Sequence, residues 1–237
     1  MARLIIIPTY NERENIKVLV PRIFKWIEDC SVLIVDDASP DRTGELVQAL
    51  RSKFPNLNLI SRNRKLGLGS AYREGFNWGL NHGFHQLIEM DADMSHRVRD
   101  LSKMLSTDPS ADLVIGSRWI PGGGTSNWSR NRQLISRAAN RYVRFALGID
   151  VKDSTSGFRI YSANLLRMLN LSSIRSEGYS FQIEMTRAAL NSGARVKEVP
   201  IIFRERESGV SKMSKAIVFE ALWLVTLWGI QRFLIRR

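Results

Sequence analysis

Two aspartates one residue apart, Asp91 and Asp93, directly follow a mostly apolar run at 86–90. Two carboxylates in so small a volume repel each other, and burial strengthens the repulsion. A cation between them removes that cost, and hard oxygen donors on a short turn suit Mg²⁺ or Mn²⁺. Two solvated loop residues that cap the next helix would give the same short pattern. The pair alone therefore leaves both interpretations open.

The apolar runs of the first half of the chain predict the strands that must position these aspartates. Short apolar runs alternate with longer amphipathic stretches, as expected for strands that alternate with helices. The runs cover residues 4–7, 32–35, 57–60, 86–90 and 112–116. This pattern is typical of an α/β protein whose mostly parallel central sheet is flanked by helices. Ligands of such sheets bind beyond the carboxyl ends of the strands.

Polar residues follow most of these predicted strands. The segments are PTYNE after the first strand, DDASPD after the second, DAD after the fourth and GSRW after the fifth. Carboxylates from the second and fourth strands would therefore meet at one rim of the sheet. Solvated loops predict no such clustering, so the strand ends favour the functional interpretation of Asp91 and Asp93.

Composition narrows the class of protein and of partner. The chain has 237 residues, 44% of them hydrophobic, which is enough for one large core or for a domain with an appendage. A formal net charge of +12 indicates a polyanionic partner: nucleic acid, anionic lipid or a phosphorylated substrate. A single cysteine, Cys30, excludes an intramolecular disulfide and a cysteine-based metal site. The apolar run before Pro8 is too short for a signal peptide, which favours a cytoplasmic protein.

The C-terminal segment 216–237 is strongly apolar and has basic flanks. Its uncharged part, 221–230, is much shorter than the roughly 20 residues that span a bilayer. With Trp223 and Trp228, the segment is typical of an amphipathic helix in the membrane interface. A packing helix or a homodimer face would give a similar pattern, and a transmembrane span fits least well.

Eight motifs in chain order carry a family resemblance. They are IIIPTYNERENI, VLIVDDASPDRTGELV, KLGLGSAYREGF, EMDADMSH, VIGSRWIPGG, TSGFRIY, GYSFQIEM and GVSKM. Together they resemble the polyprenol monophosphomannose synthases, also called dolichol-phosphate mannosyltransferases, which are inverting glycosyltransferases of the GT-A fold. The resemblance runs from about residue 4 to residue 215.

The resemblance implies an organisation and an activity. Residues 1–210 would form a GT-A, Rossmann-like catalytic domain, and 211–237 a C-terminal amphipathic segment at the membrane interface. The enzyme would transfer mannose from GDP-mannose to a polyprenyl (dolichyl-type) monophosphate with inversion, and Mg²⁺ or Mn²⁺ would be the cofactor. It would be peripheral on the cytoplasmic face of the membrane, where some members also use a membrane-anchoring partner protein.

The resemblance also implies roles for individual residues. The nucleoside pocket would be lined by Pro8, Tyr10, Glu12, Asp36 and Asp37. The metal would be held by Asp91 and Asp93. The reacting diphosphate would be contacted by Arg118, Arg204 and Lys212, and the acceptor phosphate by Arg130 and Ser136. Some members have Gln where this chain has Ser95, which leaves the third metal ligand open.

The chemistry agrees with these roles. A metal ion and arginines would stabilise the charge that builds on the departing diphosphate. A phosphate monoester, with a second pKa of about 6, is already a nucleophile near neutral pH, so no general base is required. His96 is therefore interpreted as a supporting partner or a helix-start residue.

Three other functions share parts of this pattern. A transferase of the same fold could move glucose or another sugar to polyprenyl phosphate. A nucleotidyltransferase would use a similar sheet but release pyrophosphate. A basic nucleic-acid-binding module would explain the charge. Carboxylates at a nucleic-acid site would repel phosphate, so nucleic acid is not expected as a partner.

Overall fold

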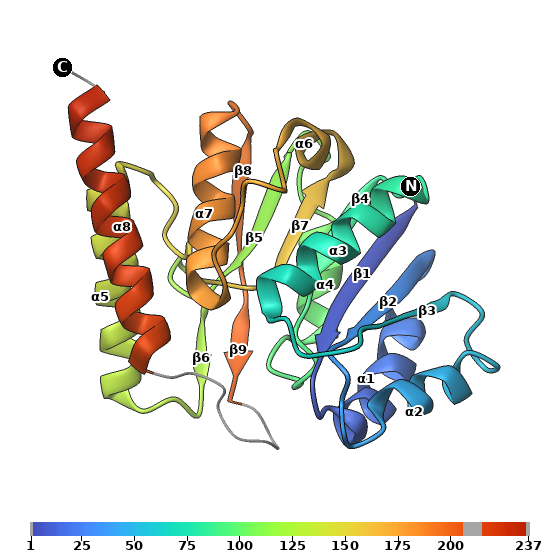
Figure 1. Ribbon diagram of the computed structural model, residues 1–237. Coiled ribbons are helices and arrows are strands. Elements are labelled where there is room, and N and C mark those ends of the chain that lie inside the picture. The colour runs from blue at the N-terminus through green and yellow to red at the C-terminus, as the bar shows by residue number, and fades with distance from the viewer. Residues whose placement is uncertain (1, 206–214, 236–237) are drawn as a thin grey trace.

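The computed structural model describes residues 2–205 and 215–235 and shows a central sheet between two layers of helices (Figure 1). The strands are β1 (Arg3–Thr9), β2 (Cys30–Asp36), β3 (Leu57–Ser61), β4 (Gln86–Glu89), β5 (Leu113–Ser117), β6 (Gly124–Ser126), β7 (Arg159–Ser162), β8 (Val196–Pro200) and β9 (Ile202–Arg204). The helices are α1 (Arg13–Trp26), α2 (Thr43–Leu50), α3 (Leu68–Asn81), α4 (Val98–Leu105), α5 (Arg130–Leu147), α6 (Ala163–Met168), α7 (Gly178–Asn191) and α8 (Lys215–Ile235). The strand–helix alternation predicted for the first half is confirmed.

The main sheet has seven strands in the order β3-β2-β1-β4-β7-β5-β8. All neighbouring pairs are parallel except those of β7, which runs antiparallel between β4 and β5. β6 and β9 form a second, two-stranded parallel sheet. The predicted mostly parallel sheet is confirmed, and β7 is the element that separates the fourth and fifth predicted strands.

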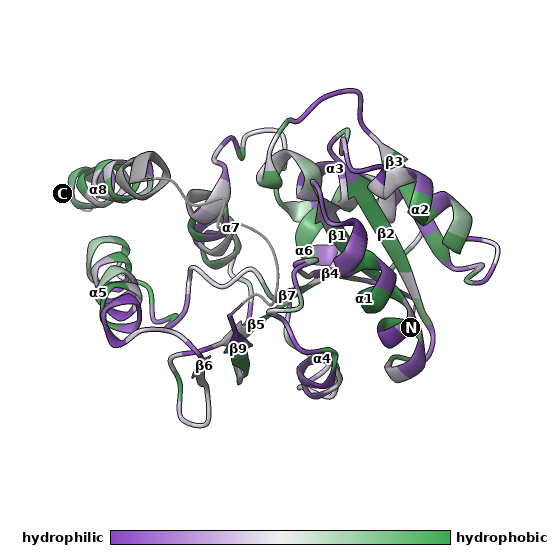
Figure 2. Cartoon of the chain, turned by 90° about the horizontal axis from the view of Figure 1, so that it is seen from below, coloured by the Kyte–Doolittle hydropathy of each residue, from purple (hydrophilic) through white to green (hydrophobic). Residues whose placement is uncertain are grey.

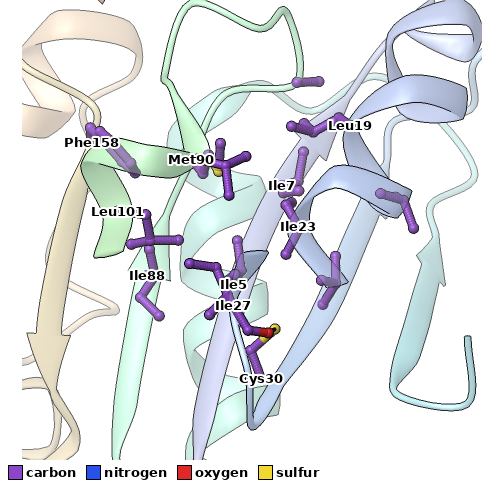
Figure 3. Close-up of a cluster of buried hydrophobic side chains, with 14 of the residues drawn as sticks. Ile5, Ile7, Leu19, Ile23, Ile27, Cys30, Ile88, Met90, Leu101 and Phe158 are labelled. Atoms are coloured by element: carbon purple, nitrogen blue, oxygen red, sulfur yellow. Dashed lines mark hydrogen bonds between the residues drawn. The ribbon is translucent and has the colours of Figure 1, made fainter. Parts of the chain in front are cut away.

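Two hydrophobic cores lie on opposite faces of the sheet because alternate residues of β1 point to opposite sides. Ile5 and Ile7 join the core under α1, α2 and α4, part of which is drawn in Figure 3. Leu4 and Ile6 join the core under α3, α6 and α7. Burial on both faces explains why this strand is an unbroken apolar run rather than an alternating one.

α5 and α8 form a third layer at one end of the molecule, against α7 (Figures 1 and 2). Val143 of α5, Ile183 of α7 and Val225 of α8 are buried in a small core of their own. Along the described residues, no helix is long and apolar enough to cross a membrane. The C-terminal segment is thus a helix, and one side of it packs on the rest of the protein.

Candidate active site

The turn that carries Asp91 and Asp93 lies between β4 and α4 and is held by its own side chains. The backbone N–H of Asp91 donates to Nδ1 of His96 over 3.0 Å. Oδ1 of Asp93 accepts from the backbone N–H of Ser95 over 3.1 Å, and Met94 between them has a φ of +64°. Asp93 is buried and the side chain of Asp91 is about one-third exposed, at 34%. The turn therefore fixes both carboxylates at the carboxyl end of a central strand.

His96 supports this turn in its neutral form. Its ring is buried, stacks on Phe158 with centroids 4.6 Å apart, and has Nε2 3.8 Å from Oδ2 of Asp91. Burial lowers the pKa of His96 to about 4, although the nearby Asp93 opposes this shift. Because Nδ1 accepts a hydrogen bond, the proton of the neutral ring lies on Nε2. His96 thus orients the turn, as the sequence indicated.

The ends of β1 and β2 place the predicted nucleoside residues side by side, with Thr9 paired to Asp36 in the parallel register. The carboxylate of Asp36 accepts from the hydroxyl of Thr9 over 2.7 Å and from the hydroxyl of Ser39 over 2.6 Å. Pro8 and Tyr10 flank Thr9 and are half-buried. These residues form one rim together with the turn after β4, which is β1's other neighbour.

Two further acidic residues at this rim accept hydrogen bonds at the starts of α1 and α2. Asp41 accepts from the backbone N–H groups of Arg13 and Thr43, each over 3.0 Å, and thus caps the starts of α1 and α2. Glu12 lies just before α1 and accepts from the side-chain amide of Asn15 over 2.7 Å.

Asp37 organises the basic, glycine-containing loop that precedes α3. Its Oδ2 accepts from the backbone N–H groups of Leu66 and Gly67, each over 3.1 Å, and its Oδ1 lies 3.0 Å from Nη1 of Arg62. Gly67 has a φ of +95°, and an added Cβ would lie 2.6 Å from Oε2 of Glu177. This loop also places the ammonium of Lys65 4.1 Å from the ring centre of Tyr10. The carboxylate of Asp37 therefore shapes the wall of the rim.

Arg118 follows β5 and is buried in a two-pronged ion pair with Asp153. Nε and Nη2 of Arg118 each lie 2.7 Å from one carboxylate oxygen of Asp153, and Nη2 also donates to Thr155 over 2.9 Å. The carboxylate of Glu198 accepts from the backbone N–H of Asp153 over 3.0 Å and fixes the loop that carries it. This pairing locks the orientation of the guanidinium group.

A largely apolar groove of about 130 Å³ opens beside Arg118, between α5, α7 and α8. Polar side chains at the groove are Arg118, Arg132, Ser136, Thr155 and Tyr179, and the rest of the lining is mostly aliphatic and aromatic. Arg132 stacks on the ring of Trp128 at 3.9 Å and pairs with Glu205 at 2.9 Å. The groove thus places cationic side chains next to an apolar lining.

The other predicted site residues lie in different settings. Ser136 lines the groove, whereas Arg130 is exposed at the first residue of α5 and does not belong to the lining. Arg204 is exposed at the end of β9, where its backbone N–H donates to the carbonyl of Ser95 over 3.1 Å. Lys212 lies outside the described residues.

Arg132 and Asp153 are candidate functional residues that the sequence interpretation missed. A helical period would have found Arg132, because residues 132 and 136 lie about 40° apart around a helix while 130 and 136 lie about 120° apart. Asp153 carries no comparable signal, since its partner Arg118 is 35 positions away.

The rim offers donors that suit a divalent cation. Among the described residues, no group of three or more histidines, cysteines, aspartates and glutamates could hold a metal ion. Asp91 and Asp93 supply two hard oxygens, and the hydroxyl of Ser95 is buried without a hydrogen-bond partner. A Mg²⁺ or Mn²⁺ ion held by two carboxylates would keep further coordination positions for substrate phosphates.

Comparisons with known proteins identify relatives of this chain. The chain is 48% identical over 230 residues to a polyprenol monophosphomannose synthase of Mycolicibacterium smegmatis, covering 96% of this chain and 87% of that protein. It is 46% identical to an undecaprenyl-phosphate mannosyltransferase of Micrococcus luteus, covering 97% and 95%.

A solved structure shares the fold. A mannosyltransferase of Pyrobaculum calidifontis in complex with GDP-Man and Mn²⁺ matches with a TM-score of 0.60 and 18% identity, covering 99% of this chain and 64% of that one. The predicted GT-A fold is confirmed. The profile of "Glycosyl transferase family 2" matches residues 4–169. The chain therefore belongs to glycosyl transferase family 2.

Proposed function

We propose that this enzyme transfers mannose from GDP-mannose to a polyprenyl monophosphate with inversion, giving polyprenyl-phosphate β-mannose and GDP. The observation that carries the proposal is the placement of the apolar groove beside the acidic strand-end rim: Arg118 lines the groove and lies near enough to Asp91 for their charges to interact. The rim suits a metal-bound sugar nucleotide, and the groove suits an anion with a hydrocarbon tail. Relatives at 46–48% identity with mannosyltransferase names support this choice of donor and acceptor.

Asp91 and Asp93 would hold Mg²⁺ or Mn²⁺, with the hydroxyl of Ser95 close by. When bound, the ion supplies Lewis-acid stabilisation of the negative charge on the departing diphosphate. Pro8, Tyr10, Glu12, Asp36 and Asp37 form or support the nucleoside pocket. Arg118, Arg204 and Lys212 act on the diphosphate.

For this reaction the protein must orient the acceptor phosphate towards the sugar donor, and it need not supply a general base. An oxygen of the acceptor phosphate attacks the anomeric carbon of mannose, a new carbon–oxygen bond forms, and the bond to GDP breaks with its electron pair. The acceptor phosphate carries its own negative charge, so no residue must remove a proton. Arg118, Arg132 and Ser136 hold that phosphate, and the positive charge of the two arginines offsets its repulsion from the donor diphosphate. Arg130, the other predicted acceptor residue, is exposed outside the groove lining, so we propose that it contributes less than Arg132.

Two of the helices that line the groove also carry exposed apolar side chains, which suit a membrane surface. They include Leu134 and Phe145 of α5 and Trp223 and Phe233 of α8. We propose that residues 1–210 are the catalytic domain and that 211–237 place it on the membrane surface. We propose a peripheral position on the cytoplasmic face of the membrane, with or without an anchoring partner protein.

A liposome experiment tests the membrane proposal with a matched control. Trp223→Ser removes an exposed tryptophan of α8, and Trp26→Ser removes one of similar exposure on α1, 65% against 58% exposed. Trp223→Ser should lower sedimentation with anionic liposomes several-fold, because an aromatic side chain anchors at the interface. Trp26→Ser should leave it unchanged. Equal sedimentation of both variants and the parent would contradict the proposal.

The donor experiment decides the function. The protein is incubated with radiolabelled GDP-mannose or UDP-glucose, each with polyprenyl phosphate and Mn²⁺, and the lipid product is identified. Labelled polyprenyl-phosphate mannose from GDP-mannose alone is the expected result. A glucosylated lipid from UDP-glucose would instead identify the polyprenyl-phosphate glucosyltransferase alternative.

A further inference from the structure

Phe203, the middle residue of β9, lies between the acidic turn and the groove. Its ring meets that of His96 edge to face, with centroids 5.4 Å apart and an interplanar angle of 77°. It meets Trp128 in the same way at 5.4 Å and 72°. The guanidinium carbon of Arg118 lies 5.5 Å from the centre of the Phe203 ring. One side chain thus contacts three groups on both sides of the proposed reaction centre.

The backbone of β9 is tied to the same two sides. The N–H of Ile202 donates to Oδ2 of Asp100 at 3.2 Å, and the N–H of Arg204 donates to the carbonyl of Ser95 at 3.1 Å. On the other side, Phe203 is paired with Thr125 of β6, the strand that leads to Trp128 and α5. The strand cannot shift without moving either the turn or the approach to the groove.

Each contact of Phe203 continues to a group that would touch substrate. His96 accepts the backbone N–H of Asp91, so the position of its ring affects that of a carboxylate. Trp128 lines the groove and carries the guanidinium of Arg132 on its ring. Close-packed interiors transmit small displacements because they leave no void to absorb them.

We propose that Phe203 is a positioning residue that couples occupation of the acidic turn to binding in the acceptor groove. The inference rests on the proposed function. It adds that binding of the nucleotide and metal ion at the donor site raises the affinity of the groove for the acceptor. Coupling of this kind is reciprocal, and its usual size is fivefold or more in affinity.

The test must remove direct attraction between the metal ion and the acceptor phosphate. Geraniol, a prenol without phosphate, serves as the probe of the groove, and its dissociation constant is measured by calorimetry on the full chain. The coupling ratio is the dissociation constant for geraniol without GDP and Mn²⁺ divided by the constant measured with them. In the parent this ratio should be about five. Phe203→Leu keeps an apolar side chain but loses the ring edges, so the ratio should fall below about twofold. Phe203→Tyr keeps the ring and should keep the ratio.

A matched control separates coupling from packing. Phe54→Leu removes a ring that stacks on Phe24 at 5.0 Å, on the side of the sheet under α1 and α2, and should leave the ratio at the parent value. The inference is overturned if Phe203→Leu keeps the parental ratio. It is also overturned if GDP with Mn²⁺ leaves geraniol binding to the parent unchanged. If Phe203→Leu does not fold, Phe203→Met is scored by the same criterion. Loss of the inference leaves the proposed function standing, because that function is judged by the transfer of labelled mannose.

Discussion

The donor rim and the acceptor groove are built in opposite ways. The rim is made of short turns that each follow a strand of one sheet, and its carboxylates are held by backbone N–H groups within a few residues or in the loop that follows the next strand. The groove is made of three helices from distant parts of the chain, and its chief cation is held by a carboxylate 35 residues away. The rim therefore depends on local geometry, whereas the groove depends on packing between helices.

Asp93→Ala tests the rim where the largest effect on activity is expected. The substitution removes a buried carboxylate that would hold the metal ion, and the lost stabilisation of several kcal/mol corresponds to about a thousandfold slower transfer. Asp108→Ala, at an exposed turn before β5, is the matched control and should keep full activity. Radiolabelled mannose transfer and a thermal melt measure activity and folding. Near-normal turnover of a folded Asp93→Ala protein would remove the metal assignment.

Asp153→Ala tests how strongly the groove depends on one distant partner. It leaves the guanidinium of Arg118 buried without its carboxylate, which costs about 3–5 kcal/mol of stability. Asp150→Ala, three residues away in the same loop, removes a carboxylate that is 82% exposed and should leave the urea midpoint unchanged. Equal midpoints for the two variants would show that the Arg118 pair does not support the groove.

The sequence revealed more of the rim than of the groove for a physical reason. Each rim motif follows its own strand, so a local pattern and the strand-end rule together bring Asp36 and Asp91 to one edge. The partners of Arg118 and the neighbours of Phe203 depend on how β7, β9 and α5 pack, and no local period encodes that packing. The sequence also did not reveal strand β7, because it has only four residues and begins at the last residue of the polar segment DSTSGFR.

The acidic turn should also make the stability of the folded protein depend on pH. The pKa of His96 is about 4 in the folded protein and about 6.5 when unfolded, so between these values the unfolded chain binds one more proton. Stability from this group is complete above pH 6.5 and is lost as the pH falls towards 4, by up to about 3 kcal/mol.

Urea unfolding between pH 7 and pH 4 measures this loss. His96→Gln should show a smaller loss over that range than the parent, because glutamine does not titrate. His82→Gln, at the exposed end of α3, should keep the parental slope. Identical slopes for the parent and His96→Gln would mean that the turn does not hold a neutral imidazole.

The smallest effect expected is a change in acceptor affinity, and it decides between two arginines of α5. Arg132 faces the groove with Ser136, whereas Arg130 is exposed outside the lining, although the family resemblance pointed to Arg130. A hydrogen bond to a charged group contributes about 1.5–3 kcal/mol, so Arg132→Gln should raise the KM for polyprenyl phosphate about tenfold or more without changing that for GDP-mannose. Arg130→Gln, two residues earlier, should change it less than twofold. The reverse ranking would move the acceptor phosphate out of the groove and towards the start of α5, so the contrast between a local rim and a packed groove would no longer hold.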